Sequence, residues 1–196
     1  MTDWGSFPSC VLQSGEDLYR IHRREQTPER LSRSGHQRFD SPSAQRVRGY
    51  GVCYLGTTPV AAYLEVFGRM RALPVPEITD RRLSVARVVR AVRLADLTNR
   101  TVLGRFGVTA SHSTASHYAE SQRLSALLHS AGFDGIRYRV KHDPAMELEA
   151  VALFGPPALG DTDNAAISWS DPLEIPAETI LSGHEFGIDV LPLFDL

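Results

Sequence analysis

Glu65 is the residue of this chain whose type and position most directly suggest chemistry. It falls in the apolar stretch VAAYLEVFGRM, which has helical spacing, on the face that also carries Ala61 and Gly68. A carboxylate on the buried face of a helix is either paired with a neighbour or held in a cleft, because an isolated buried charge is very costly. Glu65 is therefore a candidate catalytic carboxylate, with a structural ion pair as the alternative.

Two arginines are candidate anion ligands. Arg20 lies within EDLYRIH, residues 16–22, whose alternation predicts a short strand with Leu18 and Arg20 on one face. An arginine on a rigid element can bind phosphate oxygens in a bidentate manner, and a solvated arginine at a strand end is the alternative. Arg38 is a weaker candidate and lies in the polar segment 23–48, which has almost no periodicity. A loop of this length in a compact domain is usually functional or mobile.

The elements that position these residues follow no regular alternation of strand and helix. Residues 50–55 (YGVCYL) predict a buried strand, and Thr58 followed by Pro59 predicts the N-cap and first position of the helix that carries Glu65. That helix is expected to continue until Pro74. The remaining expected elements are one or two strands over 83–97, an amphipathic helix over 116–130, and strands over 134–140 and 149–154. The predicted fold class is therefore α+β.

Familiar motifs for metal, nucleophile or phosphate-loop chemistry are absent from the sequence. The histidines His112, His117 and His142 lack metal-ligand spacing, and so do Cys10 and Cys53, which are also too few for a disulfide framework. There is no GxSxG elbow, no Walker sequence and no GxGxxG after a strand. We predict neither a metal site nor dinucleotide binding through these motifs.

Composition is that of an ordinary globular protein, with 42% apolar and 22% charged residues among 196. The net charge of −2 argues against a protein that binds nucleic acid, although arginines are dense between residues 20 and 48. That density is either a solvated loop or a site for a small phosphorylated ligand. No apolar run is long enough to span a membrane, and no secretory leader is visible, so the expected location is cytoplasmic.

Four segments of the sequence occur in an order that is typical of one family. They are LYRIH (18–22), RFD (38–40), YGVCYLGTTPVAAYLEVFG (50–68) and AGFDGIRYRVKHDP…EAVALFG (131–155). The third is the most specific, because a strand tyrosine, Tyr54, precedes Glu65 across a Thr-Pro helix start. This order resembles the RES family, named for an arginine, a glutamate and a serine. The resemblance divides the chain into an N-terminal extension (1–15), a RES-like domain (16–155) and a C-terminal extension (156–196) packed on the same domain.

The resemblance implies a fold and an activity. The implied fold is similar to that of ADP-ribosyltransferases, a single α+β domain with central antiparallel or mixed sheets flanked by helices. The implied substrate is NAD, with no bound cofactor. Members of the family are toxins that deplete NAD and are paired with an Xre-type antitoxin. Some are NAD phosphorylases that use inorganic phosphate as co-substrate, and others are described as ADP-ribosyltransferases. A homo-oligomer is considered as well, and no membrane partner is expected.

The resemblance also implies roles for individual residues. Glu65 would stabilise the positive charge that develops on the ribose when the bond to nicotinamide breaks. Arg20, the second catalytic candidate, would hold the NAD diphosphate together with Arg38. Tyr54 and Tyr19 would form the walls of the nicotinamide pocket by stacking, and the 23–48 loop would cover the dinucleotide.

One position departs from the family pattern. Val140 stands where the family usually has serine, after the Tyr-Arg of the late strand, and we keep Val140 as an NAD-site position. Either the local alignment is wrong, with Ser111, Ser113 or Ser121 taking that place, or the activity is altered or lost. Three functions therefore stay open: NAD cleavage, by phosphorolysis first and hydrolysis second; ADP-ribosyl transfer to a macromolecule; and a non-catalytic module that binds NAD or a partner.

Overall fold

A large mixed sheet organises the fold. The computed structural model describes residues 2–42, 49–99, 104–109, 112, 117–156 and 165–191. In these residues, eight strands form one sheet in the order β1-β6-β7-β8-β3-β2-β5-β9, and all neighbours are antiparallel except β6 and β7. The strands are β1 (Ser9–Leu12), β2 (Asp17–Arg23), β3 (Gly51–Gly56), β5 (Arg81–Val88), β6 (Val92–Asp96), β7 (Gly135–Arg139), β8 (Glu149–Gly155) and β9 (Ile167–Trp169). The predicted α+β class is confirmed.

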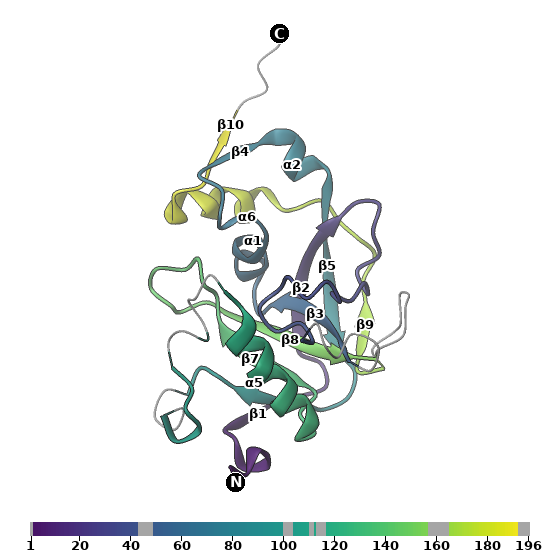
Figure 1. The fold of residues 1–196 in the computed structure, drawn as a ribbon. Coiled ribbons are helices and arrows are strands. Elements are labelled where there is room, and N and C mark those ends of the chain that lie inside the picture. The colour runs from purple at the N-terminus through teal and green to yellow at the C-terminus, as the bar shows by residue number, and fades with distance from the viewer. Residues whose placement is uncertain are drawn as a thin grey trace.

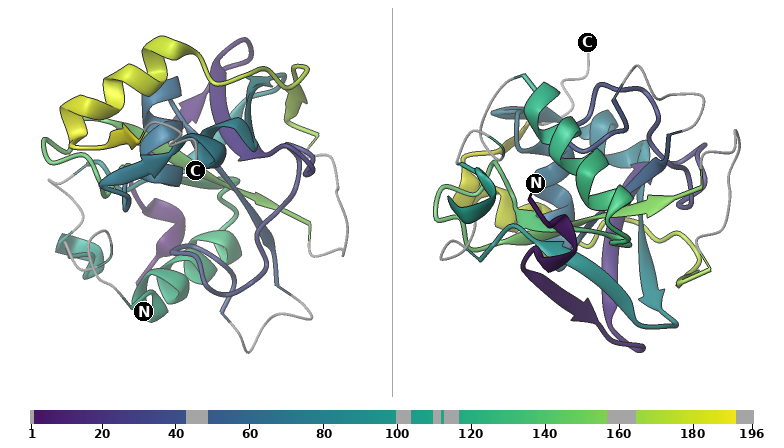
Figure 2. Two further views of the ribbon diagram at one scale, coloured as in Figure 1. Left: turned by 90° about the horizontal axis from the view of Figure 1, so that it is seen from above. Right: turned by 60° about the horizontal axis from the view of Figure 1, so that its bottom comes forward.

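Helices flank this sheet (Figure 1). The helix α1 (Pro59–Phe67) packs over β2 and β3, and α5 (Ala119–Ser130) packs against β7. Their apolar side chains share one core cluster with Val52, Ile136 and Tyr138, whereas Leu18, Cys53 and Leu55 belong to a second cluster on the opposite face of the sheet. Figure 2 shows the short N-terminal 3-10 helix η1 (Trp4–Ser6) beside α5. Both faces of the sheet thus carry buried apolar side chains, and α1 and α5 lie on the same face.

The sheet opens between β2 and β3. These strands form one register pair, Tyr19 with Gly56, whereas β2 pairs with β5 over its whole length. Farther along β3, Val52 forms a bridge with Ser32 of the following loop. A Cβ at Gly56 would lie 2.3 Å from the Ala62 backbone nitrogen, so only glycine allows α1 to pack this closely over the end of β3. The gap between the two strands therefore opens directly beside α1.

Local sequence signals located most of the elements that surround this gap. The expected strands at 16–22, 50–55, 134–140 and 149–154 correspond to β2, β3, β7 and β8. The Thr58 hydroxyl accepts a hydrogen bond from the Ala61 backbone N–H at 3.1 Å, which confirms the predicted N-cap. The 83–97 segment forms two strands, β5 and β6. The expected helix at 116–130 is α5, which begins at Ala119; residue 116 lies outside the described residues.

The predicted end of the first helix is wrong. The helix α1 ends at Phe67 with Gly68 as its C-cap, well before Pro74. Residues Ala72–Pro74 instead form β4, which pairs in parallel with β10 (Asp189–Leu191), and the short helix α2 (Val75–Thr79) follows. Leu73 of β4 is fully buried, so the pairing with a distant strand gains apolar burial that a longer exposed helix would not provide.

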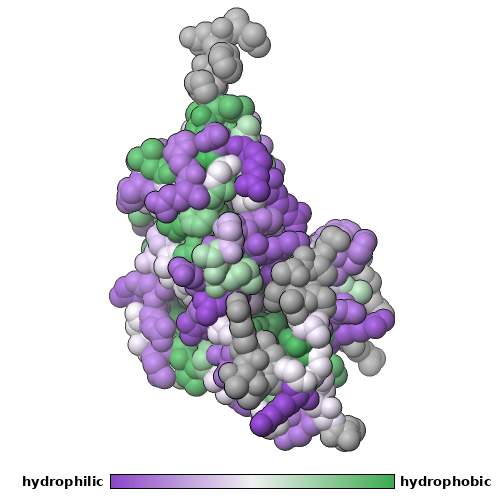
Figure 3. Space-filling model, turned by 90° about the vertical axis from the view of Figure 1, so that its left-hand side faces the viewer, coloured by the Kyte–Doolittle hydropathy of each residue, from purple (hydrophilic) through white to green (hydrophobic). Residues whose placement is uncertain are grey.

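The C-terminal segment packs along α1. The strand β9 pairs with β5, and the helices α6 (Ala177–Leu181) and η4 (Ser182–Phe186) contact α1. Two leucines at this end, Leu181 and Leu191, are exposed. Figure 3 shows an apolar area at the same end of a face that is otherwise largely hydrophilic. Among the described residues, no helix is both long enough and apolar enough to cross a membrane.

Candidate functional site

A cavity of about 390 Å³ lies where the sheet opens between β2 and β3. The strands β2, β3 and β7, the helix α1 and the 24–42 loop all contribute to its walls. Five of the six residues predicted from the sequence line it: Tyr19, Arg20, Arg38, Tyr54 and Glu65. Residues that are far apart in the sequence therefore meet in one site, as expected for the candidate carboxylate and the candidate anion ligands.

The sixth, Val140, requires a correction. Its side chain is fully buried in the core cluster beneath α1 and is not part of the cavity wall. Its backbone N–H donates to the Leu148 carbonyl oxygen at 2.9 Å, which fixes it as a structural position. Of the alternative serines, Ser111 and Ser113 lie outside the described residues. Ser121 is buried in α5 and donates to the His112 carbonyl oxygen at 2.8 Å, away from the cavity.

Glu65 is held in the cavity wall by a hydrogen bond from Tyr138. The Tyr138 hydroxyl donates to Glu65 Oε2 at 2.9 Å. Burial raises the pKa of Glu65, and the opposing effects of Arg38, of this hydrogen bond and of Arg69 reduce the rise. Burial and the nearby Glu65 carboxylate raise the pKa of Tyr138 well above its usual value, so this phenol remains a donor. Glu65 is thus oriented by one phenol and flanked by cations.

Arg38 is the most deeply buried cation of the cavity, with 9% of its surface exposed. Its guanidinium carbon lies 5.5 Å from the centroid of the Tyr138 ring and 5.8 Å from that of Phe39. Within the described part of the chain, its buried Nη1 has no hydrogen-bond partner. Because a buried unpaired donor is costly, this nitrogen is suited to an anionic ligand in the cavity. Tyr138 therefore contacts both Glu65 and Arg38.

Arg20 lies on the face of the sheet opposite to α1, and its side chain holds the 24–42 loop by hydrogen bonds. Its Nη1 donates to the Pro28 carbonyl oxygen and, at 2.9 Å, to Cys53 Sγ; its Nη2 donates to the Arg30 carbonyl oxygen at 2.6 Å. These contacts contradict the alternative of a solvated strand-end arginine. A guanidinium has five N–H groups, and these contacts use three of them, so two remain unused within the described residues for a ligand that enters the gap between β2 and β3.

The buried carboxylate of Asp40 organises the same loop. It is fully buried and accepts hydrogen bonds from five groups: to Oδ2 from Ser32 Oγ (2.8 Å), Ser34 Oγ (3.1 Å), Gly35 N (3.0 Å) and Gln37 N (3.2 Å), and to Oδ1 from the Tyr54 hydroxyl (3.1 Å). Tyr54 also accepts a hydrogen bond from the Phe39 backbone N–H at 2.9 Å. Asp40 therefore fixes the loop that places Arg38 in the cavity. It occurs in the sequence as the last residue of RFD, with no local sign of this role.

We expect Asp40→Ala to lower the free energy of unfolding by about 2–4 kcal/mol, because several buried donors lose their acceptor together. Asp40→Asn is the matched control: it keeps one oxygen for these donors and should lose less than half as much. Urea unfolding followed by circular dichroism measures both variants. Equal stability of Asp40→Ala and the wild type would show that the hydrogen bonds to Asp40 contribute nothing to the fold.

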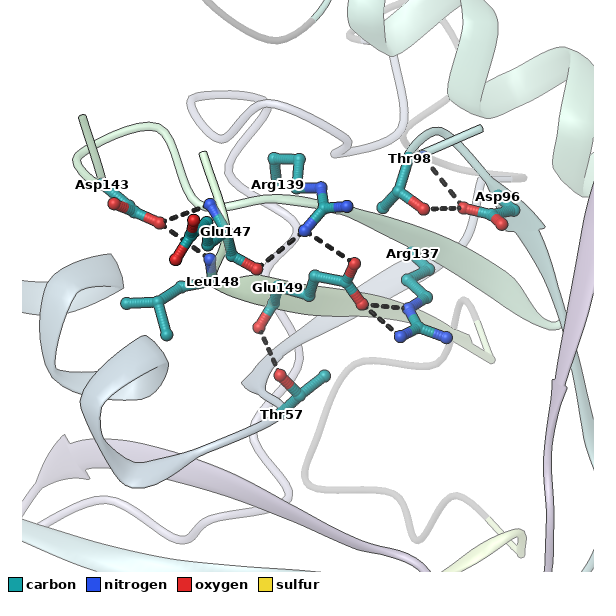
Figure 4. A network of polar contacts seen from close by, with 9 residues as sticks. All are labelled: Thr57, Asp96, Thr98, Arg137, Arg139, Asp143, Glu147, Leu148 and Glu149. Carbon is teal, nitrogen blue, oxygen red and sulfur yellow. Dashed lines mark hydrogen bonds and ion pairs between the residues drawn. The ribbon is translucent and has the colours of Figure 1, made fainter. Parts of the chain in front are cut away.

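A second buried carboxylate, Asp143, shapes the turn between β7 and β8. It accepts hydrogen bonds from the backbone N–H groups of Glu147 and Leu148, each at 2.7 Å (Figure 4). The backbone N–H of Ala145 donates to it as well, at 3.0 Å. Burial alone would raise the pKa of Asp143, but these backbone bonds hold it below its usual value. The turn is therefore stabilised by an ionised carboxylate, and it begins with Lys141 and His142, which line the cavity.

An ion-pair network supports the same pair of strands. Glu149 of β8 pairs with Arg137 and, at 2.9 Å, with Arg139 of β7 (Figure 4). Its carbonyl oxygen accepts a hydrogen bond from the Thr57 hydroxyl at 2.9 Å, just before α1 begins. This network links the paired strands β7 and β8 to the start of the helix that carries Glu65. It therefore connects the cavity wall formed by β7 to the wall formed by α1.

Five ionisable residues of the cavity wall did not follow from the sequence. They are Tyr138, Arg69, Tyr118, Lys141 and His142. The alternation of residues 134–140 already places Tyr138 on the face of Ile136, but not beside Glu65. For the others, no local sequence signal distinguishes a cavity residue from a solvated one.

The fold and the site define an α+β protein with a cationic cavity around one partly buried carboxylate. A family profile described as the RES domain matches residues 17–174, so the chain belongs to the RES family. The matched range includes β2, Glu65 and the strands β7 to β9.

One solved structure is similar in fold. It is a chain in the crystal structure of the M. tuberculosis MbcT–MbcA toxin–antitoxin complex, with a TM-score of 0.62 and 11% sequence identity. The match covers 90% of this chain and 91% of that one, so the similarity includes nearly the whole of both chains. Among curated proteins, none matches this sequence significantly.

Proposed function

We propose that this protein consumes NAD by cleaving the bond between nicotinamide and ribose, with inorganic phosphate as the acceptor. The observation that carries the proposal is the juxtaposition of Glu65 with Arg38 through Tyr138. A carboxylate suited to stabilise developing positive charge lies beside a buried guanidinium whose Nη1 is unpaired within the described residues. These are the two groups that a substrate with a cationic glycosidic bond and a diphosphate requires.

The reaction transfers ADP-ribose from nicotinamide to phosphate. The bond between the ribose anomeric carbon and the pyridinium nitrogen breaks, and its electron pair stays with nicotinamide, which leaves as a neutral molecule. Positive charge grows on the ribose, where Glu65 stabilises it. A phosphate oxygen then forms the new bond to the anomeric carbon, which gives ADP-ribose 1″-phosphate. Because the leaving group is neutral, the step needs no general acid.

The arginines and tyrosines of the cavity would position the substrate. Arg38 and the free N–H groups of Arg20 would hold the diphosphate. Tyr54 is fixed by hydrogen bonds to Asp40 and Phe39, so its ring can form a rigid wall beside nicotinamide, and Tyr19 lines the cavity with it. The 24–42 loop would cover the dinucleotide.

We also propose a biological setting. The structural relative comes from a toxin–antitoxin complex, and depletion of NAD in the cytoplasm would arrest a cell. The protein would therefore act as a toxin and be neutralised by an antitoxin of the Xre type.

The first experiment is incubation of the purified protein with NAD, with and without inorganic phosphate. Nicotinamide and the ribosyl product are followed by chromatography with mass detection. Release that depends on phosphate and yields ADP-ribose 1″-phosphate supports the proposal. Release without phosphate indicates hydrolysis, labelling of a lysate protein indicates ADP-ribosyl transfer, and NAD binding without release indicates a binding module.

Tyr138→Phe is expected to shift the acid limb of the pH–rate profile to higher pH. The Tyr138 hydroxyl lowers the pKa of Glu65, so its removal raises that pKa further, and less of the carboxylate is ionised at a given acidic pH. The aromatic ring over Arg38 remains. The profile of kcat/KM for NAD from pH 4.5 to 8 measures the shift.

The matched control is Tyr63→Phe on the same helix as Glu65. Tyr63 is buried outside the cavity, and its hydroxyl has no hydrogen-bond partner among the described residues. This variant should keep the wild-type profile. An unshifted profile for Tyr138→Phe would mean that the hydrogen bond to Glu65 does not control its ionisation.

A further inference from the structure

A second group of basic side chains lies beyond Glu65 and has no part in the scheme above. Arg69, Lys141 and His142 line the same cavity as Glu65. Arg69 follows Gly68, the C-cap of α1, and its Nη2 donates to the Tyr118 hydroxyl at 2.8 Å. A Cβ at Gly68 would lie 2.4 Å from the His142 Cβ, so the 141–148 turn packs tightly on the C-terminal end of α1.

This group and Arg20 lie toward opposite ends of α1. Tyr19, the neighbour of Arg20, pairs with Gly56, which packs on Ala62 in the first turns of the helix. His142 packs on Gly68, and Ala62 and Gly68 are about 9 Å apart along the helix axis. Glu65 lies between them on the same helix. A dinucleotide diphosphate that reaches Arg20 therefore leaves the basic group at the far side of Glu65.

The charge of the cavity wall is strongly unbalanced. Its basic residues are Arg20, Arg38, Arg69, Lys141 and His142, whereas Glu65 is its one acidic side chain among the described residues. Burial lowers the pKa of His142, and the positive charges of Arg69, Lys141, Arg38 and Arg71 lower it further. A neutral imidazole still offers one N–H donor. Such surroundings repel a pyridinium and attract an oxyanion.

We infer that Arg69, Lys141 and His142 form a second anion subsite, which holds a phosphoryl group on the far side of Glu65 from Arg20. This inference rests on the proposed function, in which an oxyanion must approach the ribose carbon that Glu65 stabilises. The phosphate oxygen forms the bond to that carbon while the bond to the nicotinamide nitrogen breaks. The phosphoryl group has two sources, free inorganic phosphate or a phosphate ester carried by the dinucleotide, as in NADP.

The first test measures binding without turnover. The melting temperature of the protein is recorded in chloride buffer with increasing inorganic phosphate, for the wild type, Lys141→Gln and Arg69→Gln. A ligand that binds the folded state raises the melting temperature, so the wild type should gain several degrees and each variant less than half of that. Arg90→Gln, which removes an exposed arginine between β5 and β6, is the charge-matched control and should behave as the wild type. Equal stabilisation of all four proteins, or no stabilisation of the wild type, overturns the subsite for free phosphate.

The second test separates the two substrates in turnover. Lys141→Gln and Arg69→Gln should each raise KM for phosphate about tenfold or more, and KM for NAD less than threefold, because a charge-assisted hydrogen bond to one substrate is lost. If the phosphoryl group belongs instead to the dinucleotide, the wild type prefers NADP over NAD and both variants lose that preference. Wild-type phosphate kinetics together with no preference for NADP would overturn the inference. Phosphate binding in the first test without NAD cleavage would instead leave the subsite standing and contradict the proposed function.

Discussion

Glu65→Gln is expected to lower the rate of nicotinamide release by roughly 10²–10³-fold, the size of effect seen when one group that stabilises transition-state charge is removed. The amide of glutamine can still accept the hydrogen bond from Tyr138, so the wall of the cavity should keep its shape. What is lost is the negative charge beside the ribose. Single-turnover release of nicotinamide and the affinity for NAD, measured separately, test this expectation.

The affinity for NAD should change by less than about threefold in the same variant, since Glu65 acts on charge that develops only in the transition state. Glu178→Gln, on the exposed face of α6, is the matched control and should release nicotinamide at the wild-type rate. Wild-type turnover by Glu65→Gln would remove Glu65 from the mechanism, even if the protein still cleaved NAD.

The setting of Glu65 was the part of the site best predicted from sequence, because its signals are local. These signals are the N-cap Thr58, the proline at the first helical position and the apolar face of the helix. All of them belong to one helix and its cap. Such signals act over three or four residues, so they can be recognised in the sequence without knowledge of the fold. The end of the same helix was misjudged because it depends on β10, more than a hundred residues later.

The other half of the site depends on long-range pairing. Tyr138 reaches Glu65 because β7 pairs with β8 and β8 pairs with β3, the strand that leads into α1. No spacing in the sequence predicts these strand pairings. The same holds for Arg20, whose donors go to loop carbonyl oxygens that only the folded loop brings within reach. Val140 was misplaced for the converse reason: its neighbourhood matched the family, but its side chain faces the core.

Two buried carboxylates, Asp40 and Asp143, share one structural task on different walls of the cavity. Each accepts several hydrogen bonds from its own loop, and each loop supplies a basic side chain to the cavity: Arg38 in the first, Lys141 in the second. Acidic residues thus order the loops without facing the cavity, which keeps its wall basic around Glu65. If these carboxylates faced the cavity, their negative charge would repel an anionic substrate.

Arg38→Ala is expected to weaken NAD binding by about 10- to 100-fold, which corresponds to the loss of charge-assisted hydrogen bonds to a diphosphate. The effect should be large because Arg38 is buried and stacked on Tyr138, so its guanidinium is already fixed before the ligand arrives. Isothermal titration of NAD into Glu65→Gln, with and without the second substitution, measures affinity in the absence of turnover.

Two further variants separate charge from geometry at this position. Arg38→Lys keeps the charge but loses the planar fork, so it should recover only part of the affinity. Arg24→Ala removes an exposed arginine from the same loop and should bind NAD as the parent does, because Arg24 lies outside the cavity. Full affinity in Arg38→Ala would show that the diphosphate lies elsewhere. Equal losses in Arg38→Ala and Arg24→Ala would instead indicate attraction by the overall charge of the loop, with no bound contact at Arg38.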